Sequence, residues 1–356
     1  MRYTRRIKCR QTENAPLIPS LTTGNKNRQW NAMQPLLLVS YGAPERQDEV
    51  VPFLNNLFAG KNVPAERIAS AVQKYKRFAA KTGHYSPLNT ECRKLIKGIR
   101  QECCPHPNPL PAGEGTIGTS LPMGEKTRIY WGNLFWHPFL ADTIAEMAKD
   151  GIERAACFAT SAFDSPSGNQ RYADALESAR RAVGTNAPIL EKLPLPFDHP
   201  LFIEAQADSL PPVSAVVCRL PSAVLLFSAH SIPLADAAQS KYVEQLQSVC
   251  RSVIEKSGMT MPWELVYQSR SGQAEHWLGP DIKERIITLA TEGHVESVIV
   301  SPIGFFCENM ETEYDLDVEA GELCAKLGLN YHRVKAVGGV PKICRMITEL
   351  LLCHEK

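Results

Sequence analysis

Apolar and polar positions alternate along most of this chain in two ways. Short apolar runs, such as LLLVS at 36–40 and VESVIVS at 295–301, are typical of buried strands. Between them lie longer segments with apolar residues at helical spacing, as in DIKERIITLATEG at 281–293. Strands that alternate with helices in this way predict parallel sheets with helices packed against them.

The alternation of strands and helices occurs twice. The first series contains LLLVS, RIYWGN, ERAACFATS and PILEK, and a second begins with SAVLLFSAH and continues through WELVYQ, VESVIVS and YHRVKAV. We therefore predict an α/β fold of two doubly wound Rossmann-like lobes with parallel sheets and a cleft between them. We expect an N-terminal lobe at 34–196, a C-terminal lobe at 197–337 and a final helix at 338–356.

Two segments lack any core pattern. Residues 1–33 are rich in Arg and Lys and carry one acid, Glu13, so we expect a disordered basic extension and a natural start at Met33. Residues 104–126 are dense in Pro and Gly, and we expect a disordered surface insertion there.

Composition narrows the class of protein. The chain has 356 residues, 44% of them hydrophobic and 22% charged, as in ordinary globular proteins. A net charge of +1 argues against a nucleic-acid partner. No run approaches the roughly 18 apolar residues of a membrane span. The eleven cysteines include no CxxC pair, which argues against structural zinc and favours a reducing cytoplasm.

An acidic segment follows the strand at 295–301. Glu311, Asp315 and Glu319 step by four and would share one face of a helix, and Glu308 would lie a turn earlier on nearly the same face. Such a row of carboxylates suits a divalent metal ion. Acids that complement a helix dipole are the alternative, which the spacing alone favours.

Polar and aromatic residues also gather where the predicted strands end. His230 directly follows a strongly apolar strand, where an imidazole is either a satisfied core group or a group that accepts a proton or binds a metal. No GxSxG motif accompanies it, so a Ser-His-Asp hydrolase has little support. Other candidates at strand ends are Tyr41, Trp136, His137, the loop at 165–168 and the segment QSRS at 268–271.

Several separated motifs resemble one family. SAHSIP at 228–233, YQSRSG at 267–272, the PIGF stretch with its acids at 302–319, and YWG with WHPF at 130–139 occur in the order found in ferrochelatases. The resemblance covers the chain from residue 34 onward, apart from 104–126. The wording of YWGNLFWHPFLADTI and TSAFDSPSG is similar to the branch from Gram-positive-type bacteria, in which several members metallate coproporphyrin III.

The resemblance implies a lyase of haem biosynthesis that inserts Fe²⁺, as a substrate, into a porphyrin and needs no organic cofactor. Coproporphyrin III is the favoured porphyrin and protoporphyrin IX the next. His230 matches the family's catalytic histidine, as a base or a metal ligand, and Glu311 its catalytic glutamate. Asp315 and Glu319 match an acidic metal path that continues from these two residues. Substrate-binding positions are expected at Tyr41, Ser86, Tyr172, Ser269 and Arg270.

Some of these roles have alternatives. Tyr41 either contacts the iron of the product or only covers the cleft, and Arg270 either binds a propionate or braces the fold through a carboxylate. Trp136 and His137 are expected to shape the core rather than to react.

The chain departs from the family's pattern at Glu308-Asn309, where Asp-His is usual. Asn309 has no group that takes up a proton or binds metal as imidazole does. This departure is the support for one rival function, a non-catalytic haem or porphyrin carrier. A chelatase for another metal or tetrapyrrole is the other rival.

Two further partners are considered from the resemblance. In some relatives a [2Fe–2S] cluster is held by one internal cysteine and a close group of three near the C-terminus. Cys157 lies in a candidate internal position, but near the end only Cys344 and Cys353 remain, nine apart, with Cys324 further back, so we expect no cluster. The product is hydrophobic, which is compatible with peripheral contact with a membrane, although the sequence contains no evident amphipathic anchor.

Overall fold

The computed structural model describes residues 34–103, 127–212, 222–270 and 274–354. The predicted extension at 1–33 and insertion at 104–126 lie outside the described residues.

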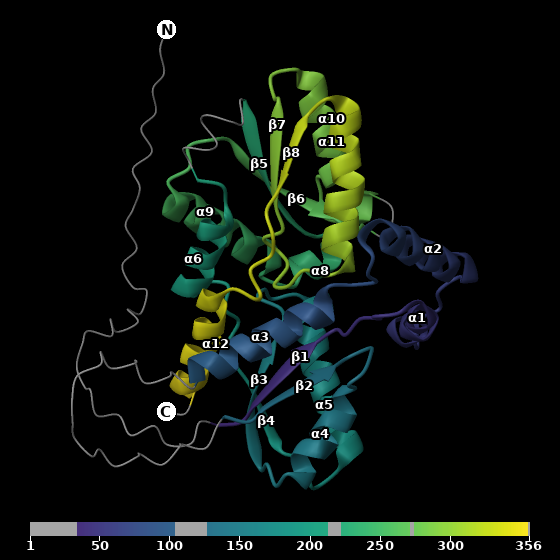
Figure 1. Cartoon of the computed structure of the whole chain (residues 1–356), viewed down its shortest axis with the longest axis vertical. Helices are drawn as coiled ribbons and strands as arrows, with labels where there is room; N and C mark the ends of the chain where they lie inside the picture. The colour runs from purple at the N-terminus through teal and green to yellow at the C-terminus, as the bar shows by residue number, and fades with distance from the viewer. Residues whose placement is uncertain (1–33, 104–126, 213–221, 271–273, 355–356) are drawn as a thin grey trace, which may run out of the picture. The chain divides into compact units, whose positions relative to one another are not determined.

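Two parallel sheets of four strands form the framework (Figure 1). The first has the order β2-β1-β3-β4 and the second the order β6-β5-β7-β8. Every pairing is parallel, so the predicted α/β fold with two doubly wound lobes is confirmed. The strands are β1 (Leu36–Ser40), β2 (Ile129–Asn133), β3 (Arg154–Ala159), β4 (Ile189–Lys192), β5 (Ala223–His230), β6 (Trp263–Gln268), β7 (Ser297–Ser301) and β8 (Asn330–Arg333).

Helices connect the strands in each sheet. The N-terminal half contains α1 (Val50–Phe58), α2 (Ala65–Thr82), α3 (Leu88–Cys103), α4 (Leu140–Lys149), α5 (Arg171–Val183) and α6 (Pro200–Ser209). The C-terminal half contains α8 (Leu234–Ala238), α9 (Tyr242–Ser257), α10 (Ile282–Glu292), α11 (Gly321–Leu327) and α12 (Pro341–His354). A π-helix, η4 (Thr312–Ala320), runs directly into α11, and the short helices are η1 (Gln47–Glu49), η2 (Pro166–Gln170) and η3 (Ala274–His276).

Helices cover both faces of each sheet, and the side chains of a strand point alternately to one face and the other. In β1, Leu37 and Val39 pack with α4 and α5, whereas Leu36 and Leu38 face α3. In β5, Leu226 packs with α10 and η4. The continuous apolar runs in the sequence follow directly from this burial on two sides.

The two sheets share one hydrophobic cluster. It continues from β1 and α3 through α6 and α12 to β5 and α9. Phe202 of α6 stacks on Phe306, which follows β7, with ring centroids 6.3 Å apart and planes at 5°. The C-terminal helix α12 packs against α3 and α6, and Figure 1 shows α12 beside α3. The lobes are therefore joined by packed side chains as well as by the chain itself.

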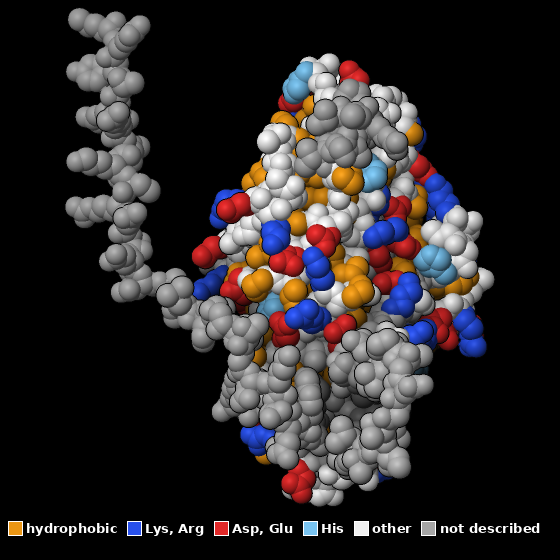
Figure 2. All heavy atoms as spheres, turned by 60° about the vertical axis from the view of Figure 1, so that its left-hand side comes forward, with side chains coloured by type: hydrophobic (Ala, Val, Ile, Leu, Met, Phe, Trp, Pro, Cys, Tyr) orange, Lys and Arg blue, Asp and Glu red, His pale blue; other side chains and the backbone are white. Residues whose placement is uncertain are grey.

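The surface carries mixed charge. On the face shown in Figure 2, basic and acidic side chains are interspersed over the described surface, with apolar side chains between them. Among the described helices, none combines the length and the apolar character that crossing a membrane requires.

Candidate functional site

Two side chains meet where β5 and β7 end. β5 ends at His230, and Glu311 lies in the helix that follows β7. The imidazole Nε2 of His230 lies 3.7 Å from Oε2 of Glu311, and both side chains remain partly exposed. The order of the sheet reverses between β5 and β7, and folds of this kind bind ligands at the carboxyl ends of such strands. The structure thus brings together the two residues that the family resemblance assigned to catalysis.

The orientation of the His230 ring follows from its hydrogen bond. Nδ1 lies 2.5 Å from the carbonyl oxygen of Ser231. A carbonyl oxygen only accepts, so in the neutral ring Nδ1 carries the hydrogen and Nε2 keeps its lone pair on the side of Glu311. The hydroxyl of Tyr242 donates to the carbonyl of His230 at 3.1 Å. The ring therefore presents a proton acceptor or a metal ligand at Nε2.

A glycine lets the loop after β7 approach β5. The N–H of Gly304 donates to the carbonyl oxygen of Ser228 at 3.1 Å. A Cβ atom at Gly304 would lie only 2.5 Å from the Cβ of Ala229, the residue before His230. No side chain fits in that space, so glycine is required where the chain passes His230 on its way to Glu311.

Glu308 does not continue the acidic face that the spacing predicted. Its buried carboxylate lies 2.9 Å from the guanidinium of Arg333 and accepts from the N–H of Ala336 at 2.6 Å. Asn309 caps the helix: its Oδ1 accepts from the N–H of Thr312 at 3.0 Å, and Oγ1 of Thr312 accepts from the N–H of Asn309 at 2.9 Å. The two unusual residues therefore shape the start of the helix that carries Glu311.

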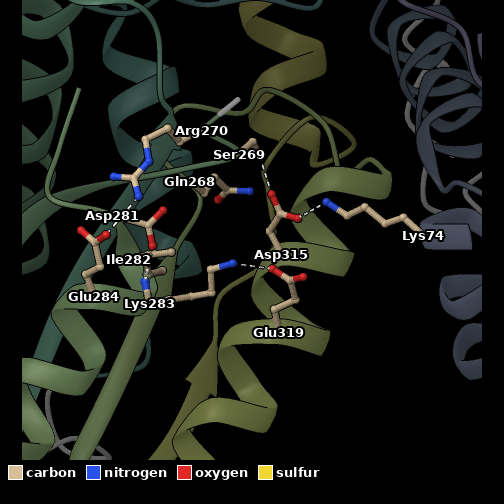
Figure 3. Close-up of a pocket in the computed structure, with 10 residues that line it drawn as sticks. All are labelled: Lys74, Gln268, Ser269, Arg270, Asp281, Ile282, Lys283, Glu284, Asp315 and Glu319. Atoms are coloured by element: carbon tan, nitrogen blue, oxygen red, sulfur yellow. Dashed lines mark hydrogen bonds and ion pairs between the residues drawn. The ribbon is translucent and has the colours of Figure 1, made fainter. Parts of the chain in front are cut away.

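The remaining acids of the predicted row lie in η4. A π-helix is rare and is often found at functional sites. Asp315 and Glu319 line a pocket of about 370 Å³, and each is held by a lysine (Figure 3). Nζ of Lys74 lies 2.5 Å from Asp315, and Nζ of Lys283 lies 2.8 Å from Glu319. The carboxylates are thus neutralised in pairs rather than left as an open row.

The four expected metal ligands do not form one cluster. Within the described ranges, no three or more His, Cys, Asp or Glu side chains come together as a group that could hold a metal ion. Burial acts to lower the pKa of Lys74, yet Asp315 and the acids beyond it raise that pKa overall, so the ammonium group stays charged. The metal path along η4 remains a prediction.

Tyr41 and Tyr172 pack together beside the first sheet. Their ring centroids are 5.6 Å apart in an edge-on arrangement. The hydroxyl of Tyr41 donates to the carbonyl of Ser167 at 2.9 Å. Burial raises the pKa of the Tyr41 hydroxyl, whereas Arg171 lowers it and the charge of Glu311 raises it further. The hydroxyl of Tyr172 is buried and hydrogen-bonds with Thr160 at 3.2 Å.

The other expected substrate contacts already have partners within the protein. Oγ of Ser86 accepts from the N–H of Leu88 at the start of α3. The hydroxyl of Ser269 donates to Asp315. Arg270 lies 3.0 Å from Glu284 of α10, which is the bracing alternative considered from the sequence.

The cysteines considered for a cluster lie on three elements. Cys157 is in β3, Cys324 in α11, and Cys344 and Cys353 in α12. Burial raises the pKa of the Cys157 thiol to about 12 and that of Cys344 to about 11. Thiols of this kind are typical of structural core residues. The absence of a cluster stays a prediction.

Three basic residues of the N-terminal half, Lys61, Arg67 and Arg171, carry no signal in the sequence. Arg171 donates to the hydroxyl of Tyr41 at 3.3 Å. Burial lowers the pKa of Lys61, and the charges of Arg171 and Arg67 lower it further. None of the three cations forms an ion pair with an acid in the described part of the chain. No sequence pattern marks this group, because its members come from the loop after α1, from α2 and from α5.

Comparisons with known proteins are consistent with this geometry. A family model described as Ferrochelatase matches residues 34–355. A ferrochelatase of Rhodopirellula baltica is 39% identical over 317 residues, covering 88% of this chain and 84% of the relative. A coproporphyrin III ferrochelatase of Frankia alni is 41% identical over 337 residues, covering 90% and 79%.

Solved structures show a likeness in fold. SirB from Bacillus subtilis with Fe³⁺ has a TM-score of 0.52 and 12% sequence identity, covering 91% of this chain and 97% of that protein. At this identity the likeness concerns the fold alone.

Proposed function

This chain belongs to the ferrochelatase family, whose members insert Fe²⁺ into a porphyrin in haem synthesis, and we propose that its porphyrin is coproporphyrin III. The observation that carries this choice is Arg171, whose guanidinium donates to the hydroxyl of Tyr41 at 3.3 Å and has no acidic partner among the described residues. Coproporphyrin III has four propionates, whereas protoporphyrin IX has two propionates and two vinyl groups. A guanidinium without an acidic partner offers charge-assisted hydrogen bonds to a propionate, which a vinyl group would leave unused.

The names of similar proteins support the same choice. Relatives from Frankia alni and Nocardia farcinica, 41% and 39% identical to this chain, are named coproporphyrin III ferrochelatase. The relative from Rhodopirellula baltica carries the broader name.

In the proposed reaction, His230 is the base. Metallation replaces the two pyrrole protons of the porphyrin with one Fe²⁺, so two protons leave for each ion inserted. The lone pair of Nε2 takes up a pyrrole proton, and the ring becomes an imidazolium that Glu311, 3.7 Å away, stabilises. The proton then passes by way of the exposed carboxylate to solvent, and the cycle repeats for the second proton.

Fe²⁺ reaches the ring along η4 in this proposal. Asp315 and Glu319 would each exchange a lysine ammonium for the incoming ion. Carboxylate oxygens suit a hydrated divalent ion. The partly exposed pair of Lys283 and Glu319 costs little to open, whereas Asp315 is buried and lies further in. Tyr41 would cover the porphyrin from the side of the first sheet.

We also place the enzyme in the cytoplasm. The eight described cysteines are free thiols, and most of them are buried. Such thiols persist in a reducing compartment.

The porphyrin choice is tested by an anaerobic assay of the purified protein with Fe²⁺ and each porphyrin in turn. We expect kcat/KM to be at least tenfold higher with coproporphyrin III. Arg171→Gln should raise KM for coproporphyrin III more than for protoporphyrin IX. Arg181→Gln is the matched control, because Arg181 is exposed on the same helix and pairs with Glu177. A higher kcat/KM with protoporphyrin IX would overturn the proposal, and binding of both without insertion would favour the carrier function.

The assigned base is tested by His230→Ala. Loss of a general base typically lowers the rate by about 10²- to 10⁴-fold, and porphyrin binding, followed by fluorescence quenching, should change little. His332→Ala removes an exposed histidine of β8 and should leave turnover intact. Turnover near the wild-type rate in His230→Ala would remove His230 from this role.

A further inference from the structure

Gln268 connects the strand of His230 to the residue Glu311. It is the last residue of β6, pairs in register with His230 of β5, and is only 1% exposed. Its Oε1 accepts from the hydroxyl of Ser228 at 2.7 Å. Its Nε2 donates to the main-chain carbonyl of Glu311 at 3.3 Å, and Figure 3 shows the amide reaching from β6 toward η4. One buried amide group therefore links β5, the strand that carries His230, to the main chain of Glu311.

Ser269, the next residue, contacts the same helix one turn later, at Asp315. Ser269 has φ of 61°, in the left-handed region that non-glycine residues rarely adopt. In this conformation its hydroxyl donates to the carboxylate of Asp315. Backbone strain of this kind persists where surrounding contacts hold it, and it is often found near functional sites. Gln268 and Ser269 thus hold the helix at Glu311 and Asp315.

The carboxylate of Glu311 has little else to hold it. Its side chain is 44% exposed, and among the described residues its one ion-pair partner is His230. The position of the carboxylate consequently depends on where the main chain of Glu311 lies. Among the described residues, the side-chain amide of Gln268 links this main chain to Ser228 of β5.

We propose that Gln268 is a positioning residue that sets the distance between the imidazole of His230 and the carboxylate of Glu311. The inference rests on the proposed roles of these two residues in metallation. The hydrogen bonds of Gln268 go to Ser228 and to the main chain of Glu311 rather than to either reacting side chain, so it acts through the strand and the helix. Because the proton passes between two groups at a fixed separation, a displacement of about 1 Å is enough to lower the rate by up to about 10²-fold.

Two substitutions separate positioning from simple filling of the core. Gln268→Leu keeps the approximate volume and removes both hydrogen bonds. Gln268→Glu keeps the acceptor for Ser228 but replaces the N–H donor by a carboxyl oxygen. When ionised, that oxygen repels the carbonyl of Glu311; when protonated, its O–H donates to the carbonyl and restores the link. Burial raises the pKa of such a carboxyl, which brings the change within the pH range of an assay.

The expected kinetic result is a loss in kcat of about 10- to 100-fold for Gln268→Leu at every pH, with the porphyrin KM within about twofold of wild type. For Gln268→Glu, kcat relative to wild type should be low at high pH and recover as the pH falls. Gln206→Leu is the matched control: Gln206 is equally buried, lies in α6, and its Nε2 has no partner among the described residues. This control should keep wild-type kinetics.

A crystal structure of each variant measures the positioning itself and needs no turnover. We expect the separation of His230 and Glu311 in Gln268→Leu to exceed 3.7 Å. An unchanged separation, or a longer one with unchanged kcat, would overturn the inference. If Gln268→Leu does not fold, the isosteric Gln268→Glu is the test. A relative kcat for this variant that stays constant or increases as the pH rises would overturn the inference. Should the wild-type protein metallate no porphyrin, the proposed function fails, while the separation still tests the role of Gln268.

Discussion

The acidic residues between 308 and 319 look alike in the sequence but have different surroundings. Glu308 is buried against Arg333, Asp315 is held by Lys74 and Ser269, and Glu311 faces His230. Glu313 lies on another side, with its carboxylate 3.4 Å from His84. The chemistry available to each carboxyl depends on which cation or donor the fold places beside it.

We expect Glu313 to make the free energy of unfolding depend on pH. Burial raises its pKa to about 7, with Lys335 opposing the rise. The folded state therefore binds a proton more tightly than the unfolded state, and the stability contributed by Glu313 is present at low pH and lost as the pH rises from about 4.5 to about 7. Glu313→Gln, which stays neutral, should be more stable than wild type at pH 8 and should lose this advantage below pH 5.

Urea unfolding at pH 5, 6, 7 and 8 measures the difference between the two proteins. Glu244→Gln, at an exposed position of α9, should show no such pH dependence. A difference between Glu313→Gln and wild type that stays constant across this range would contradict the assignment.

At the scale of elements, α2 docks on η4 through charge and packing together. Phe78 is fully buried against Tyr314 and Val318. On the same face of α2, Lys74 reaches Asp315 and Lys81 pairs with Glu322. The helix thereby supplies one of the lysines that neutralise the proposed metal path.

Lys74 is predicted to compete with the incoming metal ion. Lys74→Met keeps the packing of the stem and removes the charge, so the KM for Fe²⁺ should fall by about threefold to tenfold, because the ion no longer has to displace the ammonium group from Asp315. The measurement is the initial rate against Fe²⁺ concentration at saturating porphyrin.

Lys81→Met is the control for Lys74→Met. It removes an ion pair of the same helix that does not involve Asp315, and the KM for Fe²⁺ should stay at the wild-type value. An unchanged or higher KM in Lys74→Met would mean that Asp315 is not on the path of the metal.

At the scale of the molecule, the shared hydrophobic cluster predicts that both sheets unfold together. Phe202 is fully buried in that cluster, and Phe202→Ala should cost about 3–5 kcal/mol. Hydrogen exchange at rising denaturant should show β1 and β5 losing protection at the same, lowered concentration.

Phe53→Ala is the control, because Phe53 belongs to a small separate cluster around α1. It should increase exchange near α1 without shifting both sheets together. Separate transitions for β1 and β5 in Phe202→Ala would contradict a shared core.

The sequence determined the framework of this protein. Continuous apolar runs predicted β1, β5 and β7 most directly, because a parallel strand covered on both faces needs such a stretch, whereas β4 and β8 are partly exposed and more polar. His230 lies at the end of one of these runs, at 222–230, and the segment around Glu311 follows another, at 295–301. These signals are local, so they can be read from neighbouring residues alone.

The tertiary structure decided which groups face one another. Lys74 and Asp315, or Glu308 and Arg333, come from distant parts of the chain, and no local pattern links them. Spacing placed Glu308 on the face of Glu311, but the helix begins only after Asn309, so the carboxylate turns to Arg333 instead. Gln268 likewise gained its role from β5 and η4. Side-chain partners across a fold depend on packing, and packing is settled only when all the elements are in place.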